Sequence, residues 1–195
     1  MKTPARLLLP LLLILAPAVR AAEKGGFKYP PVFEGARTEV YKTVGDVKLS
    51  LSIFEPATGP KTGRPAIVFF FGGGWTNGDR RDYEFTGAAL ASKGILAMVP
   101  DYRVYPEVGF PGFLEDAAAA AAWAKRHAAE YGGDPDRIYL MGHSAGAYIT
   151  AMLTLDRRWL SSERAGTSRS VRGAIGLAGP YDFLPLRSSA LRTIF

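Results

Sequence analysis

The chain has 195 residues, of which 48% are hydrophobic and 22% charged, a composition typical of a folded globular protein. It contains no cysteine and only two histidines. This excludes disulfides, thiol chemistry and a histidine-rich metal site. We expect no metal and no organic cofactor, since nothing in the sequence calls for one. The net charge is +6, but basic and acidic residues are interspersed, which argues against a nucleic-acid partner.

The N-terminus predicts a secretory signal peptide over residues 1–22. Lys2 and Arg6 precede an apolar run over residues 7–18, and small residues follow this run. The run is shorter than the roughly 20 residues that span a bilayer; an uncleaved anchor or a buried core helix is the alternative. Cleavage would give a secreted or periplasmic protein without stable membrane association. A linker rich in proline and glycine is predicted over residues 23–36.

The rest of the chain, residues 37–195, predicts one α/β domain. Residues 38–44 and 47–54 flank a tight turn, and the second run alternates apolar with polar residues, which indicates a β-hairpin. Apolar runs typical of strands buried on both faces then alternate with helical stretches. The predicted strands are residues 66–71, 94–99, 137–141 and 171–177, and the predicted helices are residues 82–93, 113–131 and 145–155. This order predicts a three-layer sandwich with an N-terminal hairpin and a mainly parallel sheet.

The sequence Gly-His-Ser-Ala-Gly at residues 142–146 stands between a predicted strand and a predicted helix. A tight strand-to-helix turn strains its central residue, and flanking glycines remove side chains that would clash there. The hydroxyl of Ser144 is then held above the sheet as a nucleophile. The alternative is an ordinary serine that caps the N-terminus of the helix.

A second motif, Phe-Gly-Gly-Gly-Trp at residues 71–75, follows the first apolar strand. Acyl transfer develops an oxyanion, which needs backbone N–H groups already directed at it. Gly73 and Gly74, together with the N–H of Ala145, are the candidate oxyanion-hole donors. The motif lacks the Gly-Lys-Ser/Thr end of a phosphate-binding loop and the third glycine of a dinucleotide fingerprint. A plain flexible turn remains the alternative.

The two motifs, in this order, resemble the α/β-hydrolase family, and more narrowly its esterase branch with an HGGGW-type oxyanion loop. That branch includes hormone-sensitive-lipase-like enzymes and bacterial feruloyl- or acetylxylan-esterase-like enzymes. Intervening stretches such as Asp-Tyr-Arg at residues 101–103 and Gly-Gly-Asp-Pro-Asp-Arg at residues 132–137 are similar too. The resemblance implies a carboxylic ester hydrolase that acts on a small-molecule ester through an acyl-enzyme on Ser144.

The chain departs from the family pattern at Phe71, where many members carry a histidine that braces the loop. A larger departure is that no histidine follows Ser144, although the family triad runs serine, acid, histidine along the chain. Neither His143, beside the nucleophile, nor His127, on a predicted helix, is expected to act as the general base. Without a base, a serine hydroxyl stays protonated and is a weak nucleophile.

The acids beyond the nucleophile, Asp156, Glu163 and Asp182, do not match the catalytic acid of the family. We therefore expect this chain to be the N-terminal two-thirds of the fold, with the triad acid and histidine outside it. A parallel sheet cut short would leave an open edge and an uncovered apolar face, and the isolated chain would be poorly soluble. The alternatives are a catalytically inactive remnant or binding module, and a formamidase-like hydrolase that cleaves amides.

Overall fold

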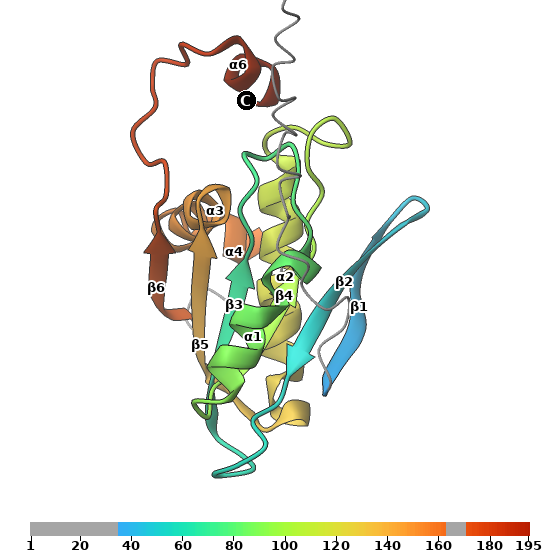
Figure 1. Cartoon of the computed structure of the whole chain (residues 1–195). Coiled ribbons are helices and arrows are strands. Elements are labelled where there is room, and N and C mark those ends of the chain that lie inside the picture. The colour runs from blue at the N-terminus through green and yellow to red at the C-terminus, as the bar shows by residue number, and fades with distance from the viewer. Residues whose placement is uncertain (1–34, 163–170) are drawn as a thin grey trace, which may run out of the picture.

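A computed structural model describes residues 35–162 and 171–195 of the chain. The fold is built on one sheet with the strand order β1-β2-β4-β3-β5-β6 (Figure 1). The strands are β1 (Ala36–Val44), β2 (Val47–Phe54), β3 (Arg64–Phe70), β4 (Leu96–Pro100), β5 (Gly133–His143) and β6 (Val171–Leu177). The β1–β2 and β2–β4 pairs are antiparallel, whereas the other three pairs are parallel. The predicted hairpin and mainly parallel sheet are confirmed.

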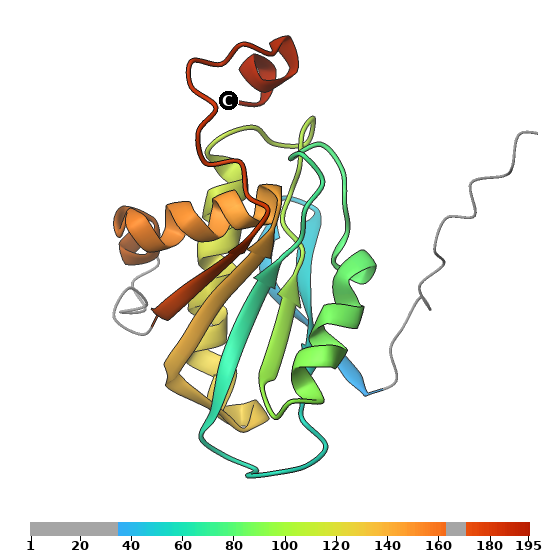
Figure 2. The ribbon, with the colours of Figure 1, turned by 60° about the vertical axis from the view of Figure 1, so that its left-hand side comes forward.

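Helices cover both faces of the sheet (Figure 2). Helix α1 packs on β4 and β2, whereas α2 and α3 pack on β5 from the opposite face. The helices are α1 (Glu84–Ala91), α2 (Gly112–His127), α3 (Ala145–Leu155), α4 (Arg158–Ser162) and α6 (Ser189–Ile194), with 3₁₀ turns η1 (Arg80–Tyr83) and η2 (Ala128–Tyr131). The three-layer sandwich predicted from the sequence is therefore confirmed.

The six consecutive alanines at residues 117–122 are all buried in α2. Small side chains let this helix lie close to the sheet, and alanine has the best helix propensity. The helix and its 3₁₀ extension end at Gly132, which has a φ of 79° and takes the left-handed conformation that terminates many helices. The predicted end of this helical region at residue 131 is thus correct.

Several predicted boundaries differ from the structure by one to four residues, including both ends of β3 and of β4. Strand β5 begins at Gly133, because Gly133 pairs with Arg64 of β3 ahead of the apolar run. The helix predicted over residues 82–93 starts as the 3₁₀ turn η1, and α1 ends at Ala91. Strand β1 begins at Ala36, the last residue of the predicted linker.

The loops after β3 and β5 lie at the same end of the sheet, where α6 also lies (Figure 1). Because the carboxyl ends of parallel strands share one edge, the two sequence motifs come together at this end. The predicted signal peptide and all but the last two residues of the predicted linker lie outside the described residues.

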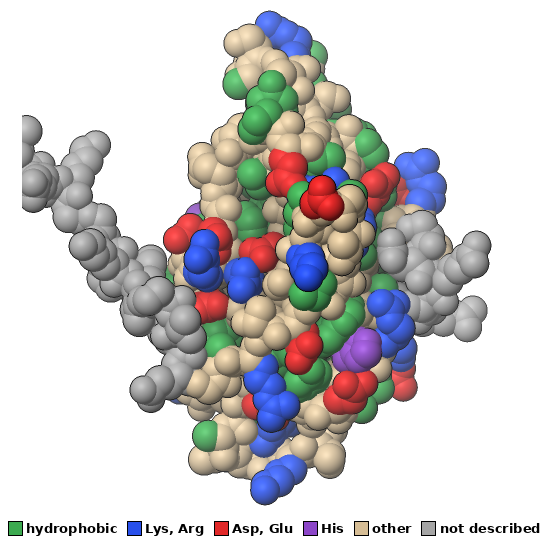
Figure 3. Space-filling model, turned by 90° about the vertical axis from the view of Figure 1, so that its right-hand side faces the viewer, with side chains coloured by type: hydrophobic (Ala, Val, Ile, Leu, Met, Phe, Trp, Pro, Cys, Tyr) green, Lys and Arg blue, Asp and Glu red, His purple; other side chains and the backbone are tan. Residues whose placement is uncertain are grey.

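Basic and acidic side chains alternate over the face drawn in Figure 3, without a continuous patch of one sign on that face. Across residues 35–162 and 171–195, no helix has both the length and the apolar character needed to cross a membrane.

Candidate active site

Ser144 occupies the turn between β5 and α3 with a φ of 52° and a ψ of −116°. Non-glycine residues rarely adopt this conformation, and such strain persists only where the surroundings enforce it. The Ser144 amide donates to the Leu177 carbonyl, 2.8 Å away, which ties the turn to β6. An N-cap serine has extended backbone angles and a hydroxyl that accepts from the helix, and Ser144 has neither. Ser144 thus stands at the N-cap position without a capping hydrogen bond from its side chain, and its backbone has the strain predicted for an elbow; its role as a nucleophile stays a prediction.

The two glycines of the elbow are required by close backbone contacts. A Cβ on Gly142 would lie 2.2 Å from the Gly146 carbonyl oxygen, and a Cβ on Gly146 would lie 2.1 Å from the Phe70 carbonyl oxygen. Both distances are far below a van der Waals contact, and the obstructing atoms are backbone. The first turn of α3 consequently lies directly beside the carboxyl end of β3, next to the glycine loop.

The glycine loop begins in contact with the elbow. A Cβ on Gly72 would lie 2.9 Å from His143 Nδ1 and 3.1 Å from Ser144 Cβ, so a larger residue there would require the elbow side chains to shift. Gly73 accepts hydrogen bonds from the amides of Thr76 and Asn77, which close the loop into a turn. Within the described residues, no hydrogen bond from the amides of Gly73 and Gly74 is present. Their N–H groups are available to a ligand.

Phe71 stands at the position where the resembled esterases often carry a histidine. Its ring stacks on Tyr102 with centroids 4.1 Å apart and planes 15° apart, and the Tyr102 hydroxyl donates to the Phe71 carbonyl at 2.7 Å. Burial raises the pKa of Tyr102 above its ordinary value, so the hydroxyl remains a neutral donor. The loop is thus braced by an aromatic stack and one buried hydrogen bond.

The other end of the loop is fixed by Trp75, which is buried and has a φ of 60°. Its indole packs edge-on against Tyr148 of α3 and against Phe195, with centroids 5.4 and 4.9 Å away. Phe195 follows α6 directly, and the Phe110 amide donates to the Ile194 carbonyl. The C-terminal segment therefore packs on the glycine loop and on the helix that follows Ser144.

A buried ion-pair cluster holds the segment after β4, beside the loop. Asp116 of α2 is fully buried and accepts from the Arg103 Nε at 2.8 Å and from Lys42 Nζ at 2.7 Å. The hydrogen bond to Asp116 raises the pKa of Arg103. Two cations share one buried carboxylate, and each of the three groups has a charged hydrogen-bond partner, so we read this cluster as one that orders the chain.

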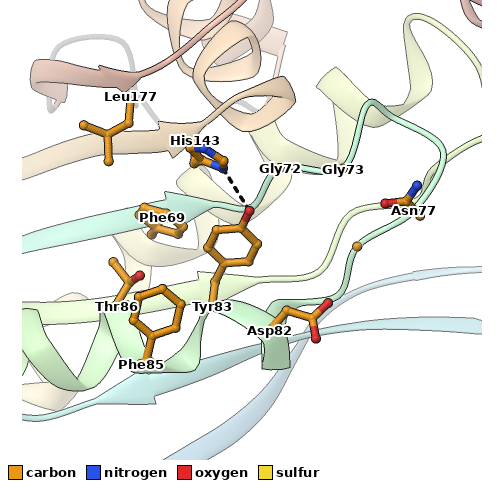
Figure 4. Close-up of a pocket in the computed structure, with 11 residues that line it drawn as sticks. Phe69, Gly72, Gly73, Asn77, Asp82, Tyr83, Phe85, Thr86, His143 and Leu177 are labelled. Carbon is orange, nitrogen blue, oxygen red and sulfur yellow. Dashed lines mark hydrogen bonds between the residues drawn. The ribbon is translucent and has the colours of Figure 1, made fainter. Parts of the chain in front are cut away.

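A pocket of about 560 Å³ opens between the glycine loop, the turn η1 and the ends of β5 and β6 (Figure 4). It is lined by Phe69, Gly72, Gly73, Asn77, Gly78, Asp82, Tyr83, Phe85, Thr86, His143 and Leu177. In Figure 4, Tyr83 and His143 point toward one another across this pocket. The lining combines aromatic and aliphatic side chains with a few polar groups, as in many small-molecule sites.

The remaining candidates do not join the site. His127 stacks on Trp123 at 4.3 Å and bonds to Glu130 on the surface, and Asp156 pairs with Arg158. Asp182 is exposed, and Glu163 lies outside the described residues.

Sequence reasoning missed Gly72, although it belongs to the quoted motif, and it missed Tyr83, for which the sequence carries no signal. Among the described residues, no group of three histidine or acidic side chains could hold a metal ion.

The chain matches the family model BD-FAE over residues 51–193. It is 34% identical over 154 residues to the probable isoprenylcysteine alpha-carbonyl methylesterase ICMEL1 of Arabidopsis thaliana, a match covering 77% of this chain and 32% of that protein. It is 41% identical over 91 residues to the carboxylesterase NlhH of Mycobacterium tuberculosis, covering 46% of this chain and 28% of that one.

Among solved structures, the apo form of Thermogutta terrifontis esterase 2 matches with a TM-score of 0.73 and 36% identity. The matched part covers 86% of this chain and 65% of that chain. The chain thus spans about a third of the curated relatives and about two-thirds of the solved esterase. With the family match spanning most of its length, the fold and both motifs in place, the chain belongs to the BD-FAE family of α/β-hydrolases.

Proposed function

We propose that the complete protein is a carboxylic ester hydrolase that forms an acyl-enzyme on Ser144. One observation carries this proposal: the strained Ser144 lies against Gly72, at the start of a loop whose next two amides make no internal hydrogen bond. A serine held in a strained turn and unpaired amides in the loop beside it are what acyl transfer requires.

In the proposed reaction, Ser144 Oγ attacks the ester carbonyl carbon while its proton passes to a general base. The carbonyl oxygen becomes an oxyanion that the N–H groups of Gly73, Gly74 and Ala145 stabilise. The base then protonates the departing alcohol, which leaves the acyl group on Ser144. Water, deprotonated by the same base, releases the acid and restores the hydroxyl.

The general base and the acid that orients it come, in this proposal, from polypeptide outside these 195 residues. The two histidines of the sequence are otherwise engaged: His143 bonds to Tyr83 and His127 bonds to Glu130. In a serine hydrolase, loss of the histidine costs roughly 10⁶ in kcat. The 195-residue chain alone should therefore show at most the weak residual hydrolysis that an oxyanion hole supports without a general base.

The substrate class is a small-molecule ester, in keeping with the names of the relatives, which include a methylesterase and a carboxylesterase. The test is hydrolysis of p-nitrophenyl acetate by the protein purified from its own source, compared with the Ser144→Ala variant of the same full-length protein. Ser188→Ala is the matched control, because Ser188 is exposed and its side chain makes no capping hydrogen bond.

Three results are distinguishable. Ester hydrolysis that is lost in Ser144→Ala and kept in Ser188→Ala supports the proposal. Preferred cleavage of p-nitroacetanilide would favour the amidase alternative. No hydrolysis of either compound by the full-length protein would favour an inactive binding module.

We also propose that the protein is exported and cleaved near residue 22. The proposal rests on the N-terminal sequence alone, with its basic start and apolar run. N-terminal sequencing of the mature protein tests it: a first residue close to Glu23 is expected, and a retained Met1 in a cytoplasmic fraction would contradict export.

A further inference from the structure

One hydrogen bond joins the turn before α1 to the residue that precedes the nucleophile. The Tyr83 hydroxyl lies 2.9 Å from Nδ1 of His143, although the two residues are 60 positions apart in the sequence (Figure 4). Tyr83 ends η1 and immediately precedes α1, whereas His143 ends β5. The bond therefore connects the helix on one face of the sheet to the elbow.

The imidazole of His143 also touches the glycine loop. A Cβ on Gly72 would come within 2.9 Å of Nδ1 and within 3.1 Å of Ser144 Cβ. The ring nitrogen that meets Tyr83 therefore faces the side of Gly72 on which a side chain would stand, and Ser144 Cβ faces the same side. A rotation of the imidazole would move it into the backbone of the loop or open a gap beside it.

The phenol ring of Tyr83 is itself held in place. It lies near Phe69 of β3 and near Phe71, with centroids 5.5 and 6.4 Å away. Phe69 and Phe71 belong to the strand segment that leads into the glycine loop. Tyr83 thus packs on the segment that carries the loop and bonds to the residue beside the nucleophile.

We infer that Tyr83 is a positioning residue: its hydroxyl donates to Nδ1 of His143 and holds the imidazole against Gly72, which fixes the glycine loop beside Ser144. A ring that accepts at Nδ1 carries its proton on Nε2. Among the described residues, the only hydrogen bond of this ring is the one to Tyr83. The importance of this bond for catalysis rests on the proposed function, but the bond itself can be measured without turnover.

The test uses ¹⁵N-histidine NMR at about pH 8, where an unperturbed imidazole is neutral. Because the chain has two histidines, the His127→Gln variant assigns the His143 signals. The wild type should show the Nε2–H tautomer of His143. In Tyr83→Phe, both tautomers should be populated and the amide signals of Gly72 and Gly73 should shift. Tyr139→Phe on β5 removes a tyrosine hydroxyl that makes no hydrogen bond to His143 and should change neither.

A wild-type His143 with its proton on Nδ1 would overturn the inference, whether or not Tyr83→Phe folds. Unchanged tautomer populations or unchanged glycine amide signals in Tyr83→Phe would also overturn it. In the full-length enzyme, Tyr83→Phe should lower kcat by roughly two- to tenfold with KM unchanged, as expected for one lost hydrogen bond. Complete absence of turnover would count against the proposed function and would leave the NMR result to decide the role of Tyr83.

Discussion

The two faces of the sheet differ in how far they are covered. On the face of α2 and α3, a single large core runs from β2 to β5 and includes Ile138 and Leu140, both fully buried. On the face of α1, the core consists of Phe54, Ile67, Phe69, Ala97 and Val99. Farther along that face, on β6, Ile175 and Leu177 are 42% and 41% exposed.

The core on the face of α2 and α3 supports the turn at Ser144. The strained turn at Ser144 leads into α3, whose inner side is buried in the large core on the face of α2 and α3. Backbone strain of this kind costs about 1–3 kcal/mol and persists only where packing over-determines it. The half-covered face contributes the pocket and the contact between Tyr83 and His143 instead. One face therefore holds Ser144 in place, and the other lines the space in front of the glycine loop.

The largest expected effect is at Gly146 of α3, on the face of the sheet that α2 and α3 cover. In Gly146→Ala, the new Cβ would lie 2.1 Å from the Phe70 carbonyl oxygen and 2.4 Å from that of Phe71. Since neither backbone segment can yield without breaking the sheet, the free energy of unfolding should fall by at least about 3 kcal/mol. Urea denaturation measures it. Gly59→Ala is the control, because nothing lies within 4 Å of Gly59 and only its φ of 85° opposes the change, which costs about 1 kcal/mol. Equal losses in the two variants would contradict the close packing.

A matched pair of leucines compares the two faces directly. Leu140→Ala on β5 should cost about 2–5 kcal/mol, because it leaves a cavity in a fully buried site. Leu177→Ala on β6 should cost less than about 1.5 kcal/mol, because its side chain is already partly in water. Urea denaturation of both variants measures the two losses in the free energy of unfolding. A loss of stability in Leu177→Ala as large as that in Leu140→Ala would mean that the Leu177 side chain is buried in solution, and this would contradict the difference between the two faces.

The strain at Ser144 can be measured by comparing two substitutions. Ser144→Gly should be about 1–2 kcal/mol more stable to unfolding than Ser144→Ala, since glycine adopts a φ of 52° without a Cβ penalty. Both variants lose the Ser144 hydroxyl, so activity does not enter the comparison. Identical thermal and urea midpoints would mean that the elbow is unstrained.

The smallest expected effect is at Asp79, which caps η1 on the half-covered face. Side-chain hydrogen bonds from Arg81 hold the pKa of Asp79 below its ordinary value of 3.8. A lowered folded pKa stabilises the fold above the ordinary value, and this contribution disappears as the pH falls through the folded pKa. Asp79→Asn should therefore cost less than about 1 kcal/mol at neutral pH, because the pair is largely exposed. The cost should vanish in acid. A cost that persists unchanged at acid pH would mean that charge is not its cause.

Much of the fold could be predicted because its elements carry local signals. The alternation at residues 47–54 and the apolar runs of β3 and β6 place strands within a few residues of their observed bounds. The start of β5 was missed because residues 133–137 are polar and join the sheet through pairing with Arg64, a distant contact. Helices α4 and α6 are too short to give a periodic pattern.

The candidate site likewise contains residues that a local motif predicts and residues that only the fold brings together. Ser144, Gly73, Gly74 and Ala145 stand in compact motifs whose turn chemistry is local, so their neighbourhood could be predicted, and their catalytic roles stay predictions. The contact between Tyr83 and His143 arises only when the folded chain brings the turn η1 beside the end of β5. No spacing within the sequence encodes such a contact, and only the folded chain reveals it.

The central claim is that Ser144 is the nucleophile. The most direct test treats the full-length protein from its source with paraoxon, the compound that phosphorylates the matched Thermogutta terrifontis esterase 2, and maps the modified peptide by mass spectrometry. We predict one phosphorylated residue, Ser144, and no modification in Ser144→Ala. Esterase activity that survives in Ser144→Ala, or a phosphoryl group on another residue, would contradict the claim.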